Sequence, residues 1–332
     1  MDSVGDMARA LVLRTNQVRL REEMDQLAVE VSTGFVRDPA QHLKGDTTGL
    51  MAIDRALSKL DTYRVNTTEA GFLTGAMQTA LDEMQSRSET LSQSLIAAEL
   101  TPNSSLLNTM SDDAQNALGQ IINGLNRSVA GRFLFSGVAT DRGALQEVDD
   151  FLNAARTALT GATTLADVET ALDTFFGPGG TYETTIYQGA NTGLAPMQLS
   201  ETESANVDIR ASDDTFRDML KPIVMAALAT DNGIGLDQSV QVEVLAKSGR
   251  DLLGAQQSVV ELRAGLGALE ARIEETVTRN SAEKTATSMA RLDLVGADAY
   301  DTASRYENIR GQLESLYAIT ARSQRLSLAE YL

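Results

Sequence analysis

The sequence contains no cysteine, no tryptophan and only one histidine, His42. The absence of cysteine excludes disulfides and thiolate metal sites. A single histidine excludes a metal site built on a pair of histidines. His42 lies between Pro39 and Gly45, in a segment that we interpret as a solvated loop. We therefore expect no metal, no cofactor and no catalytic site.

Positive charge is also scarce, because the formal net charge is −18. This balance argues against a nucleic-acid-binding protein, which must neutralise phosphates, and it disfavours binding to anionic membranes. No run of about 18 apolar residues occurs, so no segment is predicted to span a bilayer. Residues 1–6 lack the basic and apolar regions of a cleaved signal peptide, so any export is expected to use another route.

The remaining candidates for chemistry have simpler explanations. Ser136 lacks the glycine two positions earlier that a nucleophile elbow requires. The pairs Asp112–Asp113 and Asp213–Asp214 each follow a serine, where capping of a helix explains them. The Asp149–Asp150 pair is interpreted as solvated surface. The sequence therefore predicts a protein that is not an enzyme.

Long helical patterns dominate what is present. Between residues 7 and 33, Leu13, Leu20 and Leu27 recur every seven residues, which predicts a helix with a heptad seam that ends at Gly34. Further helices are predicted over residues 50–100 with a possible break at Gly71 and Gly75, after an N-cap at Ser111, and from residue 236 to about 280.

The last stretch, residues 291–332, contains no proline and carries an apolar stripe with steps of three and four. It ends in Leu326–Leu332, which is still apolar and has no capping glycine. Domains usually end in polar, poorly ordered residues unless the end is held in place. We therefore expect this helix to need a partner, either within the chain or in another copy.

The middle of the chain has a different character. Residues 141–240 hold 16 acidic and 5 basic residues, and their apolar periodicities are short and mixed. Strands are predicted at Tyr182–Tyr187 and Asn206–Arg210. We expect three parts: a helical stem over residues 1–139, an acidic, compact α+β insert that faces solvent over 140–235, and a second helical stem over 236–332.

Three stretches together resemble the flagellin family. They are Val31–Gly34, which resembles the family's Leu-Ser-Thr-Gly segment, the element Gly131, Arg132, Phe133, Leu134, Phe135, Ser136 and Gly137, and the apolar terminus Ser323–Leu332. The second element is especially typical of the family's hook–filament junction members. The chain departs from the family at Phe35, where a basic residue is common, and the usual opening Met-Arg-Ile-Ser/Thr is absent.

The resemblance implies a mainly α fold, with the terminal helices paired as a long antiparallel coiled-coil stem and a small α+β outer domain. It also implies an extracellular subunit of the bacterial flagellum, exported through the type III channel without a cleaved signal peptide. Its implied partners are copies of itself in a ring or short helical layer, an adjacent hook-associated junction protein, flagellin, and a cytosolic export chaperone at the C-terminal helix.

The residues that we predict as seam or assembly contacts are the apolar ones of the two terminal helices. They are Leu13, Leu20, Leu27, Tyr306, Leu313, Leu316, Leu328 and Leu332. The function predicted is a structural subunit that joins hook to filament. A filament-forming flagellin and, from another class, a cytoplasmic helical adaptor protein are the alternatives.

Overall fold

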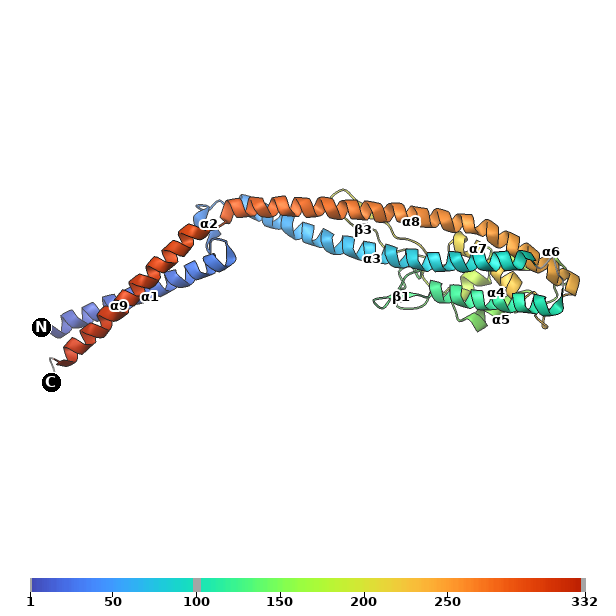
Figure 1. Cartoon of the computed structure of the whole chain (residues 1–332), viewed down its shortest axis with the longest axis horizontal. Coiled ribbons are helices and arrows are strands. Elements are labelled where there is room, and N and C mark those ends of the chain that lie inside the picture. Colours follow the sequence, from blue (N-terminus) through green and yellow to red (C-terminus); the bar gives the residue numbers. More distant parts are fainter. Residues whose placement is uncertain (1, 98–102, 330–332) are drawn as a thin grey trace. The chain divides into compact units, whose positions relative to one another are not determined.

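The computed structural model describes residues 2–97 and 103–329. Helices dominate this part of the chain, and its other regular elements are four two-residue strands and one turn of π-helix (Figure 1). The predicted fold class, a mainly α protein with long helices and a small outer domain, is confirmed.

The chain forms two compact units. The first joins Met1–Asp61 with Ser281–Leu332, and the second is Thr62–Asn280. The first unit therefore combines segments from opposite ends of the sequence. The boundaries that the sequence suggests at 139/140 and 235/236 stay a prediction.

In the first unit, α1 (Asp2–Thr33) and α9 (Ala299–Ala329) lie side by side in antiparallel orientation (Figure 1). Gly34 has a φ of +74° and ends α1, as expected, because glycine adopts this left-handed conformation without a Cβ clash. The short helix α2 (Pro39–His42) follows, capped by the Asp38 side chain, which accepts a hydrogen bond from the backbone of Gln41.

The C-terminal helical pattern is interrupted, which corrects two predictions. The helix expected to end near residue 280 continues as α8 (Gln238–Val295), and the helix expected over residues 291–332 is broken before α9. The cause is the segment after α1. The Val36 amide donates to the Val295 carbonyl at 3.0 Å, and the Ala297 amide donates to the Gly34 carbonyl at 2.9 Å. These bonds replace the ones that a continuous helix would make.

Helix α3 (Thr48–Ile96) runs antiparallel to α8, and both contribute to both units. Within the second unit, the Ser92 hydroxyl donates to the Gly249 carbonyl at 2.8 Å. The break expected in α3 is absent. A Cβ added at Gly71 would lie 3.8 Å from the Ile273 side chain, so tertiary packing against α8 covers the glycine and outweighs its low helix propensity.

Helix α4 (Ser104–Leu125) begins eight residues earlier than predicted. Asn103 is its N-cap, and its side chain accepts a hydrogen bond from the Ser105 amide at 2.9 Å. Ser111 instead lies inside the helix, where its buried hydroxyl donates to carbonyls at the end of α7 (Asp214–Ala227). The Ser-Asp-Asp sequence therefore resembles a helix cap, but the Ser111 hydroxyl instead bonds to the neighbouring helix α7.

The insert is built around aromatic side chains. The hairpin of β1 (Ser128–Val129) and β2 (Arg132–Phe133) precedes it. Its own elements are α5 (Val148–Ala158), α6 (Leu165–Phe176), the π-helical turn η2 (Tyr182–Ile186), β3 (Met197–Gln198), β4 (Ser204–Ala205) and α7. Phe151 lies 6.0 Å from Phe175 and 5.9 Å from Tyr182, measured between ring centroids. Tyr182 is fully buried, and its hydroxyl donates to the Ala211 carbonyl at 2.6 Å. Burial raises the pKa of Tyr182 above its usual range, which keeps this donor protonated.

Both predicted strands are wrong. Residues 182–186 form the π-helical turn, and residues 206–210 lie outside any strand. Tyr182 and Ile186 are fully buried, whereas Thr184 between them is exposed. A strand would place all three side chains on one face, whereas one helical turn places only residues 182 and 186 together. The β-branched and aromatic composition therefore misled the strand prediction, because packing of Tyr182 and Ile186 decides the local structure.

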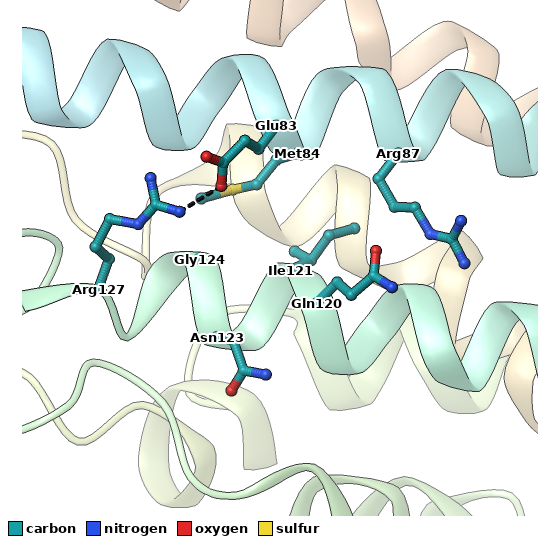
Figure 2. Close-up of a pocket in the computed structure, with 8 residues that line it drawn as sticks. All are labelled: Glu83, Met84, Arg87, Gln120, Ile121, Asn123, Gly124 and Arg127. Atoms are coloured by element: carbon teal, nitrogen blue, oxygen red, sulfur yellow. Dashed lines mark hydrogen bonds and ion pairs between the residues drawn. The ribbon is translucent and has the colours of Figure 1, made fainter.

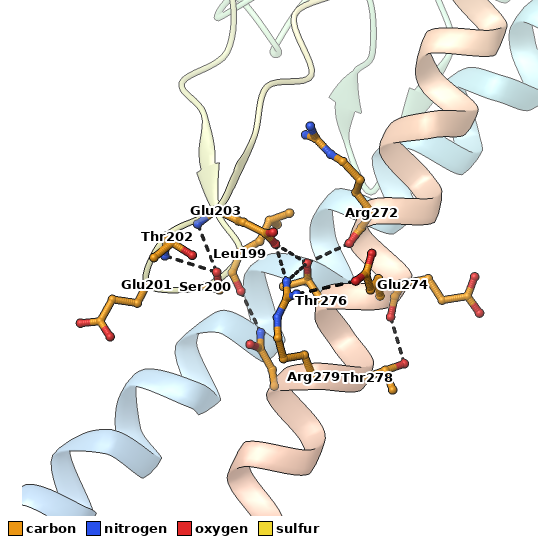
Figure 3. A network of polar contacts seen from close by, with 12 residues as sticks. Leu199, Ser200, Glu201, Thr202, Glu203, Arg272, Glu274, Thr276, Thr278 and Arg279 are labelled. Atoms are coloured by element: carbon orange, nitrogen blue, oxygen red, sulfur yellow. Dashed lines mark hydrogen bonds and ion pairs between the residues drawn. The ribbon is translucent and has the colours of Figure 1, made fainter.

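The β3–β4 hairpin binds the long helices through its turn (Figure 3). The Leu199 side chain is buried, and the backbone carbonyl of Leu199 accepts a hydrogen bond at 2.8 Å from the side-chain amide Nδ2 of Asn280 in α8. The Glu203 carboxylate accepts from the Thr276 hydroxyl and from the Arg279 guanidinium, each at 2.6 Å. These contacts fix the hairpin on α8.

The attachment of this hairpin is expected to depend on pH. The hydrogen bond from Thr276, followed by the charge of Arg279, lowers the pKa of Glu203 below its usual 4.5. A carboxyl with a depressed folded-state pKa stabilises the fold above the unfolded pKa, and this contribution is lost as the pH falls through the folded pKa. Amide-exchange protection of residues 197–205, corrected for intrinsic rates, should therefore fall below pH 4.5.

Two variants check this cause. Glu203→Gln should remove the pH dependence, and Thr276→Val should move its midpoint upward, because the largest stabilising contact of the carboxylate is gone. Protection that falls identically in all three proteins would contradict the assignment to Glu203.

Candidate assembly site

The seam between α1 and α9 has a small apolar core. Leu20 and Leu27 of α1 and Ile309 and Leu313 of α9 are buried together. Met24, Tyr306 and Leu316 are partly buried and pack against this cluster. The heptad spacing of the two helices therefore produces one continuous contact within the chain.

The eight residues predicted as seam or assembly contacts fall into three groups. Leu20, Leu27 and Leu313 lie in the buried cluster, and Tyr306 and Leu316 lie at its edge. Leu13 is half-buried. The side chain of Leu328 and the whole of Leu332 lie outside the described residues. A role of these residues in contacts between subunits stays a prediction.

A polar pair, which sequence reasoning did not find, extends the seam beyond the apolar cluster. The Arg21 Nε donates to the Tyr317 hydroxyl at 2.9 Å, and its guanidinium lies 5.7 Å from the centre of the tyrosine ring. Hydrogen bonding, first from Gln17 and then from Arg21, lowers the pKa of Tyr317. Both partners are solvent-accessible and 296 residues apart, so no local pattern indicates the contact.

A second apolar face of α1 remains open although α9 covers the first. Met7 is 73% exposed and Leu11 is 67% exposed, and Val12 and Val18 are also exposed. On this side of α1, the apolar side chains of Leu11 and Val18 are bordered by Arg14, Arg19 and Glu22. On α9, Ile319 is exposed as well. The paired helices thus present apolar side chains to solvent, which is typical of a surface that another protein covers.

The family motif Gly131–Gly137 forms a loop between α4 and the insert. Ala130 and Gly131 both have positive φ, 52° and 78°, and form the tight turn of the β1–β2 hairpin. The following Leu134, Phe135 and Ser136 are buried. The second half of the motif therefore has a structural role in the core, while Gly131 at the hairpin turn is exposed.

Backbone hydrogen bonds from this loop hold two other loops. The Ala190 amide donates to the Ser136 carbonyl, and the Ala211 amide donates to the Phe135 carbonyl, both at 2.9 Å. The Phe135 ring contacts Phe216 of α7 edge to face, with centroids 5.6 Å apart. Two consecutive motif residues thereby hold the loop that contains Ala190 and the loop that contains Ala211.

Gly137 ends the motif at a position where only glycine fits. Its φ is +61°, and a Cβ added there would lie 2.5 Å from the Thr192 carbonyl oxygen and 2.6 Å from that of Ala190. Backbone carbonyls cannot move aside as a side-chain end can, so both the dihedral and the space exclude a side chain.

The candidates for chemistry lie apart from one another. Ser136 is buried, and its hydroxyl donates to the Arg142 carbonyl at 2.9 Å. His42 is exposed at the end of α2. Among the residues that the structure describes, no group of three or more His, Asp or Glu side chains could hold a metal ion. In the same residues, no helix is long and apolar enough to cross a membrane.

Comparison with known proteins identifies the C-terminal part of this site. Residues 252–332 match the family described as the bacterial flagellin C-terminal helical region. This match covers the part of α8 from Leu252 onward and all of α9, which is one side of the seam. No curated protein sequence matches the chain.

The fold resembles that of solved structures, one of which is informative. It is a Vibrio parahaemolyticus protein described as a flagellar hook-associated protein, with a TM-score of 0.53 and 15% sequence identity over 77% of this chain and 98% of that one. The match over residues 252–332 confirms the resemblance to the flagellin family that the sequence motifs indicate, and the solved structure shows the shared fold.

The motif loop gives a first prediction for this site. Gly137→Ala should destabilise the second unit by about 2–4 kcal/mol, because the added Cβ meets two carbonyl oxygens in a left-handed backbone conformation. Gly161→Ala is the matched control. Gly161 has a φ of +87° but no atom within 4 Å of an added Cβ, so only about 1 kcal/mol is expected. Equal losses in urea unfolding would contradict the steric argument.

The seam gives a second prediction. Leu20→Ala should lower the opening free energy of α1 and α9, measured by amide exchange, by about 2–3 kcal/mol, because Leu20 is buried in a small cluster. Leu11→Ala removes the same atoms from an exposed position of the same helix and should change that free energy by less than about 0.5 kcal/mol. Similar effects of the two substitutions would show that the seam does not stabilise the helices.

Proposed function

Because residues 252–332 carry the C-terminal helical region of the bacterial flagellins, we propose that this chain is a structural subunit of the bacterial flagellum, and specifically the one that joins hook to filament. The observation that carries the proposal is the pair α1–α9. It combines a seam within the chain with an apolar face that nothing in the described chain covers.

The geometry suggests a mechanical role. The seam pairs the terminal helices, and exposed side chains such as Met7, Leu11 and Ile319 are left for neighbouring subunits. In a ring or short helical layer, these faces would pack on copies of the chain, on an adjacent hook-associated protein at one end and on flagellin at the other. Burial of apolar surface between subunits is the driving force expected for such an assembly.

Two features favour the junction over the filament. The motif Gly131–Gly137 is typical of junction members of the family, and the fold is shared with a protein described as hook-associated. In this proposal the chain has the role of hook-associated protein 3. It is exported to the cell exterior, and a cytosolic chaperone covers the apolar C-terminal helix before export.

A filament-forming flagellin is the second candidate, because the matching family region is named for flagellins. The two differ in copy number and in self-assembly. Purified junction protein should form no long polymer, whereas purified flagellin should polymerise alone into filaments. Electron microscopy of the concentrated purified chain separates them.

The test in cells is the position of a labelled subunit. We expect the label only at the distal end of the hook, and a chain that lacks residues 323–332 should be absent from flagella. In that truncated chain, α5, α6 and α7 should keep their amide-exchange protection, because their core lies in the second unit. Label along the whole filament would favour flagellin, and normal flagella built with the truncated chain would overturn the proposed role of the C-terminal helix.

A further inference from the structure

A groove of about 370 Å³ lies between α3 and α4 in the second unit (Figure 2). Its floor is apolar, because Met84 of α3 and Ile121 of α4 are buried. The helices approach closely here, since a Cβ added at Gly124 would lie 3.1 Å from the Met84 side chain. Polar side chains from both helices form the rim above this floor.

The two arginines of the groove differ in their partners. Arg127 forms an ion pair with Glu83 across the groove. Arg87 takes part in no ion pair within the described part of the chain, and its Nε atom is buried without a hydrogen-bond partner. Figure 2 shows Arg87 and Gln120 extending from facing helices toward the same end of the groove.

An uncommitted guanidinium beside an apolar floor favours one kind of ligand. A carboxylate can accept two parallel hydrogen bonds from arginine, and this geometry is stronger than contact with a point charge. The buried Nε is out of reach of another chain, so such a carboxylate would bind the terminal nitrogens of Arg87, which take part in no ion pair among the described residues. The groove therefore suits a segment that presents acidic side chains.

The chain itself carries such a segment. Asp149 and Asp150 are exposed in the first turn of α5, and neither takes part in an ion pair among the described residues. They belong to the region of residues 141–240 with 16 acidic and 5 basic residues. Copies with a net charge of −18 repel one another, so a contact between them needs a cation placed opposite an acidic cluster.

We propose that the α3–α4 groove receives the Asp149–Asp150 carboxylates of a neighbouring copy, with Arg87 as the residue that binds them. This inference rests on the proposed function in one respect, since it takes a second copy of the chain as the partner. It adds a contact between subunits that involves the second unit and is independent of the terminal helices.

Charge exchange tests the contact in purified protein. Sedimentation at low salt should show weak self-association of the wild-type chain, and Arg87→Glu should weaken it by at least about tenfold. The double substitution Asp149→Lys and Asp150→Lys should weaken it similarly. An equimolar mixture of the two variants should restore association, because each then offers the charge that the other lacks.

The mixture also identifies where the contact is made. Restoration in the mixture requires a contact between chains, whereas restoration only when all three substitutions are in one chain would place it within a chain and overturn the proposal. Arg55→Glu is the matched control, because Arg55 is an exposed residue of α3 without an ion pair among the described residues. It should leave association unchanged, and thermal unfolding should confirm that each variant is folded.

Other results would also overturn the inference. A wild-type chain that stays monomeric at low salt up to its highest soluble concentration contradicts it, as does an Arg87→Glu chain that associates like the wild type. The proposed function is judged separately, by the position of the labelled subunit in cells. A correctly placed subunit whose association ignores Arg87 would refute the groove contact alone.

Discussion

The first unit of this protein depends on the contact between helices from opposite ends of the chain. Leu20 and Leu27 meet Ile309 and Leu313 across nearly 300 residues of sequence, and the cluster is small. A two-helix seam of this size buries little apolar surface, and most helical stability in proteins comes from packing of this kind. The first unit is therefore the part of the chain most sensitive to the loss of a single apolar side chain, and also the part that offers most apolar surface to other proteins.

The second unit is stabilised by a larger core than the first. Its core joins the long helices to the aromatic side chains of the insert, among them Phe151, Phe175 and Tyr182. The motif loop then fixes the positions of segments that have little regular structure of their own, through carbonyls at Phe135 and Ser136. At Gly137 this loop has no room for a side chain, because backbone carbonyl oxygens of other loops lie against it. This explains why Gly137 can belong to a recognisable motif without any chemical role.

Sequence reasoning succeeded where periodicity is long and failed where structure is set by distant contacts. The heptads of α1 and α8 identified helices and their buried sides correctly, and Gly34 marked a real helix end. It failed at Ser111, which resembles a cap but bonds α7, and at residues 182–186, where Tyr182 and Ile186 enter the core from one π-helical turn. No local sequence pattern predicts the Arg21–Tyr317 pair or the unpaired Arg87. Each depends on which residues from distant parts of the sequence lie nearby.

The sequence by itself determined the mainly helical fold, the apolar sides of the long helices and the resemblance to flagellins. These follow from spacing and motifs, which act over one or two helical turns. Only the tertiary structure decided that the helical pattern breaks at residues 296–298, because backbone groups of residues 34–36 take the hydrogen bonds there. It also decided which side of α1 stays exposed and which arginine of the α3–α4 groove stays unpaired. Both depend on which helix packs where, and a local pattern does not contain that information.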